Sequence, residues 1–153
     1  MKFSIQRELL LKPLQTVVGV VEKRQTMPVL SNLLLQLEND RLVLTGTDLE
    51  VEMVAYLHVN NPIPGSTTVP GKKLLDICKA LPAEAEINFS YDAGKVLVQS
   101  GRSRFTLACL PVEEFPSLDD IQTQHSISLN QEHFKRVVDK TSFCMAQQDV
   151  RYY

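Results

Sequence analysis

Cysteine is scarce in this sequence: there are three, an odd number, and none lies in a Cys-x-x-Cys spacing. Neither a disulfide framework nor a zinc ribbon is therefore indicated. Long apolar runs are also missing, since none approaches the roughly 18 residues of a membrane span. The early charges of MKFSIQREL argue against a secretory signal peptide. These absences predict a soluble, unexported, cytoplasmic protein that has no contact with a membrane.

Catalytic motifs are missing as well. The sequence has no GxxxxGK[ST], GxGxxG, HExxH or GxSxG spacing, so phosphate-loop, dinucleotide, zincin and hydrolase functions have no motif support. The carboxylates of Asp48, Glu50 and Glu52 are candidate metal ligands, but Glu50 and Glu52 alternate with apolar residues as on a solvated strand face. We expect no metal and no cofactor. One enzymatic alternative stays open, a nucleophilic Cys109 or Cys144 paired with a histidine. The histidines lie on a predicted strand, a linker and a helix: His58, His125 and His133.

The composition is that of an ordinary globular protein, with 44% apolar and 22% charged residues in a chain of 153. This length suits one domain or one and a fraction. The formal charge of -2 argues against a protein that coats nucleic acid indiscriminately. It leaves room for a local basic strip on an otherwise acidic body.

A short strand followed by an amphipathic helix occurs three times, at Ile5–Val18, Val69–Leu81 and Leu129–Ser142. Alignment of the three copies places apolar residues in register on one helical stripe. These residues are Leu10, Leu74 and Phe134, followed by Leu14, Cys78 and Val138. Three copies of one pattern predict a repeat architecture.

Successive residues of a helix are rotated by about 100°, which places a second set of side chains opposite the apolar stripe. This opposite face leans toward positive charge. It carries Lys12, Gln15 and Lys23 in the first copy, Lys72, Asp76 and Lys79 in the second, and Arg136 and Lys140 beside Glu132 and Asp139 in the third. One interpretation is a solvated helix face. The other is a surface built for a polyanion, made by repeated cationic faces.

The first half of the chain predicts a β-α-β-β-β order. Pro13 should kink or split the helix, and Leu42, Leu44, Val51, Met53 and Ala55 should face a core. The expected strands span 2–5, 32–38, 41–46 and 50–59, the helix 6–22, and the turns 39–40 and 45–48. Residues 23–28 form a polar connection, and residues 60–65 (NNPIPG) a linker too rich in Pro and Asn to continue a strand.

The second half repeats this order. Its expected elements are strands at 66–69, 85–91, 95–101 and 102–110, a helix at 71–81 and a hairpin turn at 92–94. The predicted fold is α+β, with two helices packed on an antiparallel sheet drawn from both halves. The domain assignment is 1–120, with halves 1–60 and 61–111 and a linker at 112–124, followed by 125–153 as an incomplete domain that opens with a strand at 126–129 and a helix at 131–143.

Several stretches resemble the bacterial sliding clamp family, the β subunit of DNA polymerase III. They are Thr45–Val54 (TGTDLEVEMV), the N-terminal MKF, LLLKPLQ, Ser100–Leu107 (SGRSRFTL) and the final MAQQDVRYY. The resemblance extends over the whole chain. Members of this family have three domains of like fold per chain and two chains per ring. The resemblance therefore implies the first domain and the start of the second.

The resemblance implies a DNA clamp fold, in which helices line a central hole and sheets form the outer wall. It implies a non-enzymatic processivity factor that tethers the replicative polymerase, any polymerase or exonuclease activity belonging to the holoenzyme. The implied partners are double-stranded DNA, the primer–template junction, polymerase III subunits, the clamp loader and, in a full-length homodimer, a second chain. The family's pocket for partner peptides lies between its second and third domains, which this chain should lack.

Contacts with DNA are implied for two sets of residues. Arg24 matches a family position that contacts DNA, as do Gln148, Tyr152 and Tyr153; the alternative for the tyrosines is one buried and one exposed side chain on a strand. On the helix faces, the candidates are Lys12, Gln15, Lys72 and Lys79. Contacts to phosphates without base reading suit a ring that must slide.

A subunit interface is implied at the predicted strand 102–110. The matching residues are Lys73, Ile77, Arg102, Arg104, Phe105 and Leu107. In the family this edge pairs with the third domain of the other subunit, so normal ring closure is not expected for this chain. Two alternatives to a clamp stay open: the enzyme described above and a scaffold that has no role on DNA.

Overall fold

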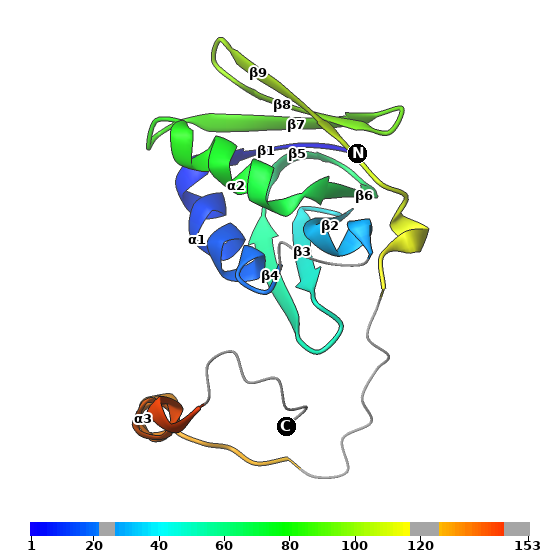
Figure 1. The fold of residues 1–153 in the computed structure, drawn as a ribbon. Helices are drawn as coiled ribbons and strands as arrows, with labels where there is room; N and C mark the ends of the chain where they lie inside the picture. The colour runs from blue at the N-terminus through cyan, green and yellow to red at the C-terminus, as the bar shows by residue number, and fades with distance from the viewer. Residues whose placement is uncertain (22–26, 117–125, 146–153) are drawn as a thin grey trace. The chain divides into compact units, whose positions relative to one another are not determined.

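The computed structural model describes residues 1–21, 27–116 and 126–145 of the chain (Figure 1). The chain divides into two compact units, Met1–Leu118 and Asp119–Tyr153. No helix in the described ranges is both long enough and apolar enough to cross a membrane.

The described part of the first unit follows the predicted β-α-β-β-β order twice, with one additional strand. The elements are β1 (Lys2–Gln6), α1 (Arg7–Val18), β2 (Asn32–Glu38), β3 (Arg41–Thr47), β4 (Glu52–His58), β5 (Asn60–Ile63), β6 (Gly65–Pro70), α2 (Gly71–Ala80), β7 (Glu86–Asp92), β8 (Lys95–Ser100) and β9 (Ser103–Ala108). Two short 3₁₀ helices accompany them, η1 (Pro28–Ser31) and η2 (Val112–Glu114). The predicted α+β class is confirmed.

The strands form two antiparallel sheets, where the sequence predicts one. The larger has the order β5-β1-β7-β8-β9 and the smaller the order β4-β3-β2-β6 (Figure 1). The strand β1 pairs with β7 of the second half, and β6 pairs with β2 of the first. Each half therefore gives its opening strand to the sheet of the other half. Two sheets bury apolar side chains from both inner faces, which one sheet covered only by helices does not.

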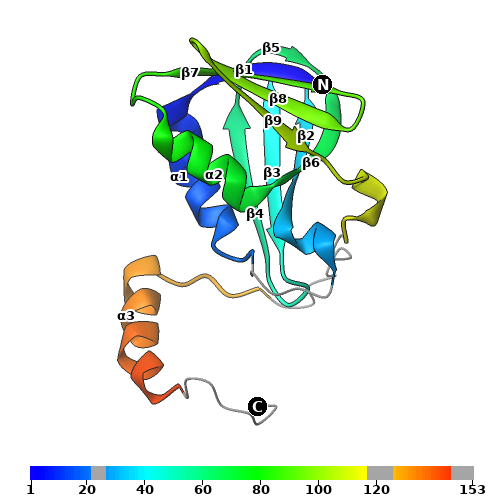
Figure 2. The same cartoon turned by 45° about the horizontal axis from the view of Figure 1, so that its top comes forward.

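A single core joins both sheets and both helices. Phe3 on β1 stacks on Phe89 of β7 with ring centroids 4.5 Å apart. Leu10 and Leu14 of α1 and Leu74 of α2 are buried in the same cluster. In Figures 1 and 2 the two helices lie side by side along one side of the two sheets. The predicted inward stripe of α1 and α2 is therefore the face that packs on the core.

The linker predicted at 60–65 is wrong, because residues Asn60–Ile63 form the strand β5. It pairs with β1, with Lys2 opposite Ile63 and Ser4 opposite Asn60, and the register shifts between these two pairs. In the described chain β5 has no neighbour on its other side. An edge strand tolerates proline because its outer N–H groups need no ladder partner, and this explains Pro62.

The turn predicted at residues 45–48 is also wrong, because β3 continues through Thr47. The reversal comes at Asp48, whose Oδ1 accepts the backbone N–H groups of Glu50 at 2.9 Å and Val51 at 2.7 Å. Both bonds lower the pKa of the Asp48 carboxyl, and the bond from Val51 has the larger effect. The side chain of Val51 is consequently 49% exposed and does not face the core as predicted.

Gly46 is a packing residue and not a turn residue. It lies inside β3, where an added Cβ would lie 2.9 Å from both the Cγ1 and the carbonyl oxygen of Val17. Only glycine lets the strand approach α1 this closely. The glycine that suggested a turn in the sequence therefore marks where the first helix rests on the smaller sheet.

The helix α1 is shorter than predicted and is not split. It ends at Val18, whereas the sequence predicted residue 22, and it runs through Pro13 as one element. Proline removes one helical hydrogen bond. Burial of Leu10 and Leu14, on either side of Pro13, holds the helix against the core across that position.

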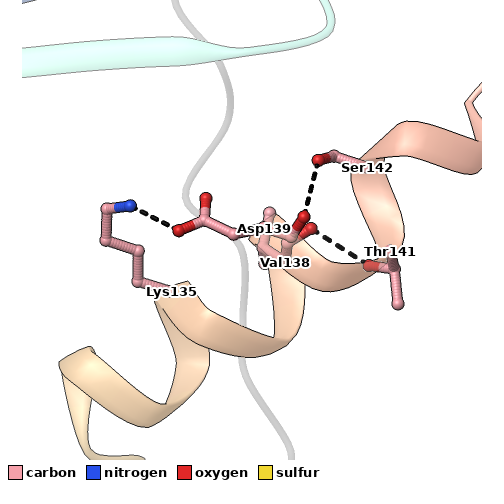
Figure 3. A network of polar contacts seen from close by, with 5 residues as sticks. All are labelled: Lys135, Val138, Asp139, Thr141 and Ser142. Atoms are coloured by element: carbon pink, nitrogen blue, oxygen red, sulfur yellow. Dashed lines mark hydrogen bonds and ion pairs between the residues drawn. The ribbon is translucent and has the colours of Figure 1, made fainter.

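In the second unit the strand predicted at 126–129 is absent, and the helix α3 spans Gln131–Thr141 before a 3₁₀ turn at Ser142–Cys144. A short strand needs a neighbour to pair with, and the described residues of this unit supply none. The helix is stabilised locally. Asn130 Oδ1 accepts the N–H groups of Glu132 and His133. Lys135 pairs with Asp139, and the hydroxyls of Thr141 and Ser142 donate to carbonyls of the preceding turn (Figure 3).

The core packing predicts a large difference between two neighbouring leucines of α1. Leu10 is 1% exposed and Leu9 is 57% exposed. Leu10→Ala should lower the free energy of unfolding by about 2–5 kcal/mol, because it leaves a cavity. Leu9→Ala, the matched control, should change it by less than about 0.5 kcal/mol. Urea titration followed by circular dichroism measures both, and similar losses for the two variants would contradict the assigned helix face.

Candidate nucleic-acid face and association edge

The exposed face of α1 carries Lys12 and Gln15. The helix buries Leu10, Leu14 and Val17, and Lys12 lies about 200° around the axis from Leu10. Lys12 and Gln15 are both exposed. The side of α1 turned away from the core is therefore polar, with Glu8 one turn before Lys12 as its acidic member.

The exposed face of α2 carries Lys72 and Lys79. Leu74 and Cys78 are fully buried on the opposite side. Lys72 and Lys79 share one stripe, since residues two turns apart on a helix lie on the same face. Asp76 is exposed between them, so this stripe has two positive charges and one negative. The face leans toward positive charge without being uniformly basic.

The two helices pack on one another, so their polar faces border the same side of the unit. Figure 2 shows α1 and α2 adjacent, to the left of the strands. The four residues predicted for the helix face are therefore exposed on two adjacent helices: Lys12, Gln15, Lys72 and Lys79. The remaining predicted DNA contacts lie outside the described residues: Arg24, Gln148, Tyr152 and Tyr153.

The strand β9 is an open edge of the larger sheet in the described chain, because it pairs with β8 alone. Beyond its end the N–H of Cys109 donates to the carbonyl of Gly94 at 2.9 Å. Hydrogen-bonded and non-hydrogen-bonded positions alternate in an antiparallel ladder. The N–H and C=O groups of Arg104, Thr106 and Ala108 therefore point away from β8, toward a further strand.

The side chains of this edge differ in how available they are. Leu107 is 6% exposed and belongs to the core, so its apolar surface is already covered within the unit. Phe105 is half-buried and packs against the same core, while Arg102 and Arg104 are exposed. On α2, Lys73 is exposed and Ile77 is half-buried against the core. Phe105 and the arginines are therefore the accessible part of the predicted interface.

The open edge at β4 of the smaller sheet was not predicted from the sequence; β4 pairs with β3 alone in the described chain. Val54 and Tyr56 are exposed on its outer face, and the Arg41 guanidinium lies 4.0 Å from the centroid of the Tyr56 ring. The signal was present, because this strand has apolar residues at both alternating sets of positions. Such a strand has one apolar set that its own core does not bury.

A cysteine–histidine nucleophile pair has no support in the described part of the chain. Cys78 is fully buried, and burial raises the pKa of its thiol to about 12 despite the nearby Arg7 guanidinium. His58 lies 3.2 Å from Asp40 on the surface, and no hydrogen bond between the described residues joins a cysteine to a histidine. Residues 1–21, 27–116 and 126–145 contain no group of three potential metal ligands.

A hollow of about 580 Å³ lies beside the hairpin between β8 and β9. Glu84, Glu86 and Arg102 are its charged lining residues, and neither a histidine nor a cysteine reaches it. Ser100 and Ser103 supply its hydroxyl groups. The lining therefore lacks the cysteine and the histidine that the enzymatic alternative requires.

Comparison with known proteins agrees with this description. The family described as DNA polymerase III beta subunit, N-terminal domain, matches residues 1–119. The beta sliding clamp of Pseudomonas putida is 54% identical over the whole chain. The DNA polymerase III subunit beta of Pseudomonas aeruginosa has a crystal structure that superposes with a TM-score of 0.93 at 52% identity, again over the whole chain. The corresponding protein of Caulobacter crescentus superposes with a TM-score of 0.92 at 37% identity.

The chain belongs to the DNA polymerase III beta-subunit family. The resemblance inferred from TGTDLEVEMV and SGRSRFTL is thereby confirmed, and so is the clamp fold that it implied. The chain covers 42% of the length of the Pseudomonas putida sliding clamp. The activity of a complete sliding clamp is therefore proposed for this chain and not shown by the comparisons.

Cysteine labelling tests the buried thiol of this clamp domain. Burial keeps Cys78 protonated, whereas Cys144 is exposed. At mildly alkaline pH iodoacetamide should alkylate Cys78 at least about tenfold more slowly than Cys144, because the thiolate is the reactive form. Peptide mapping by mass spectrometry measures both rates, and unfolding in urea should equalise them as a control. Fast labelling of Cys78 in the folded chain would contradict its place in the core.

Proposed function

We propose that this chain is the DNA-facing first domain of a sliding clamp, a processivity factor for DNA replication, with the opening of a second domain. The observation that carries the proposal is the pair of adjacent helices whose exposed faces bear Lys12, Lys72 and Lys79 opposite a shared buried core. A duplex offers regularly spaced phosphates, and such a face attracts them without reading bases.

The mixed character of this face suits sliding. Asp76 lies between Lys72 and Lys79, and Glu8 lies one turn before Lys12. A uniformly basic face would release more counterions on binding and hold DNA more tightly. A face with interspersed carboxylates neutralises phosphates weakly, so that the protein stays on DNA through enclosure and not through affinity.

The rest of the proposed DNA contact comes from residues outside the described ranges. We assign phosphate pairing to Arg24, and hydrogen bonding or stacking to Gln148, Tyr152 and Tyr153. Aromatic side chains suit unpaired bases, so the tyrosines would engage the single-stranded template at a primer–template junction.

For the full-length protein, the proposed assembly is a homodimeric ring in the cytoplasm, serving polymerase III subunits and a clamp loader as a non-enzymatic accessory subunit. Three free cysteines are compatible with a reducing compartment. In this assembly β9 is the subunit edge. Its outward N–H and C=O groups would extend the sheet into the partner, with Phe105 covered and Arg102 and Arg104 facing acidic groups.

The helix face predicts site-specific effects on DNA binding. Fluorescence anisotropy of a labelled duplex at low ionic strength measures the association constant and its dependence on salt. Lys72→Gln and Lys79→Gln should each lower the slope of log K against log salt by about 0.9, the value for one lost phosphate contact. Lys95→Gln, which removes the same charge from an exposed position on β8, is the matched control and should leave the slope unchanged.

Two results of this titration contradict the proposed DNA face. Equal slopes for the unmodified chain and its three variants mean that the helix lysines do not contact phosphates, as expected of a scaffold without a DNA role. Equal losses for Lys95→Gln and the helix variants mean that net charge, and not a defined face, attracts the duplex.

The open edge predicts self-association that a charge on it removes. Light scattering over a range of concentrations should give a mass above that of the monomer for the unmodified chain and the monomer mass for Phe105→Asp. A carboxylate at a half-buried aromatic position prevents strand addition. Ile63→Asp is the matched control, because it also replaces an apolar side chain by a carboxylate, at an exposed residue of the opposite edge strand β5. This variant should still associate.

Thr106→Pro separates association from stability. The N–H of Thr106 points away from β8, so proline there removes a group used only for adding a strand. Loss of association in both Phe105→Asp and Thr106→Pro supports the edge. A monomer for the unmodified chain at every concentration contradicts its role in this chain.

A further inference from the structure

The first residue of α1 makes one hydrogen bond to the last turn of α2 and another to the connection that follows α2. The backbone N–H of Arg7 donates to the carbonyl of Ala85 at 2.8 Å, and its side-chain Nε donates to the carbonyl of Cys78 at 3.0 Å. Arg7 is half-buried at this junction. One residue thus holds both the end of α2 and the connection that follows it.

The sequence leaves the carbonyl of Cys78 without a helical partner. In a continuing helix its donor would be the N–H of residue 82, but that residue is Pro82, which has none. The preceding carbonyl, that of Ile77, takes the N–H of Leu81 at 3.2 Å. The Arg7 guanidinium replaces the missing donor and puts a positive charge at a helix C-terminus, where the helix dipole favours it.

The same bond lies beside the proposed DNA face. Lys79 follows Cys78 directly on α2, and Lys12 lies on α1 a little over one turn from Arg7. Both helices also bury apolar side chains in the same core cluster, and apolar packing has no preferred direction. The hydrogen bond from Arg7 does have a preferred direction, because the donor N–H must point toward the carbonyl oxygen.

We infer that Arg7 is a positioning residue for the DNA face: by bonding the Cys78 carbonyl, it fixes where the end of α2, and with it Lys79, stands relative to α1. The inference rests on the proposed function, since it assigns a role within that face. Arg7 itself need not touch DNA, because its Nε is already committed to the carbonyl.

Hydrogen exchange tests the link without DNA. In Arg7→Gln the amides of residues 79–81 should exchange about tenfold faster, the change expected from the loss of one charge-assisted hydrogen bond. Arg7→Lys, which keeps the charge without the Nε–H, is the second variant and should show an increase as well. Arg41→Gln, an exposed arginine on β3, is the charge-matched control and should leave these amides unchanged. Unchanged exchange in both Arg7 variants overturns the link.

A double-mutant cycle tests the link on DNA, using the anisotropy titration with the same duplex. Lys79→Gln should lower the salt slope by about 0.9 in the unmodified chain and by less than half of that in an Arg7→Gln background, because a displaced Lys79 has little contact to lose. Arg41→Gln should leave the effect of Lys79→Gln at its full size.

The outcomes separate this inference from the function on which it depends. Full additivity of Arg7→Gln and Lys79→Gln, with affinity retained by Arg7→Lys, means that Arg7 binds phosphate directly and overturns the positioning role alone. If the two substitutions are additive and Arg7→Gln leaves the affinity for DNA unchanged, Arg7 has a purely structural role. This result also overturns the positioning role. Salt slopes that none of the helix lysines changes overturn the DNA face, and the role of Arg7 with it.

Discussion

The two halves of the first unit exchange their opening strands, and this exchange determines how both sheets and both helices are arranged. The strand β1 pairs with β7, and β6 pairs with β2, so neither sheet is complete without the other half. Each exchanged strand runs without a linker into its helix, at Gln6–Arg7 and at Pro70–Gly71. Pairing of the strands therefore also determines where α1 and α2 begin, and both helices lie on one side of the unit.

This arrangement separates two kinds of surface. The helix side shows lysines, because the apolar stripe of each helix is used by the common core. The sheets end in strands such as β9 and β4, whose backbone groups have no further partner in the described chain. The unit therefore has a lysine-bearing helix side and open sheet edges, although the net charge of the whole sequence is only -2.

Much of this was readable in the sequence, and the errors have physical causes. The apolar stripes of α1 and α2 were predicted correctly, because Leu10, Leu14, Leu74 and Cys78 recur at helical spacing. The matching positions of α3, Phe134 and Val138, are exposed in the described second unit. Gly46 was taken for a turn, because a sequence does not show that a helix passes within contact distance of a strand. Pro62 was taken for a linker, because only pairing with β1 shows that it lies on an edge. The division into two sheets depends on long-range pairing, which local periodicity does not encode. Arg24 and the terminal QDVRYY depend on the family resemblance alone.

Nuclear magnetic resonance of the chain, titrated with a short DNA duplex at low ionic strength, locates the contact residue by residue. If α1 and α2 face DNA, the backbone amide shifts concentrate on their exposed faces, around Lys12, Gln15, Lys72 and Lys79. These shifts should disappear as salt is added, while the outer faces of both sheets stay unchanged. Shifts centred on the sheets, or none on the helices, would contradict the proposed DNA face.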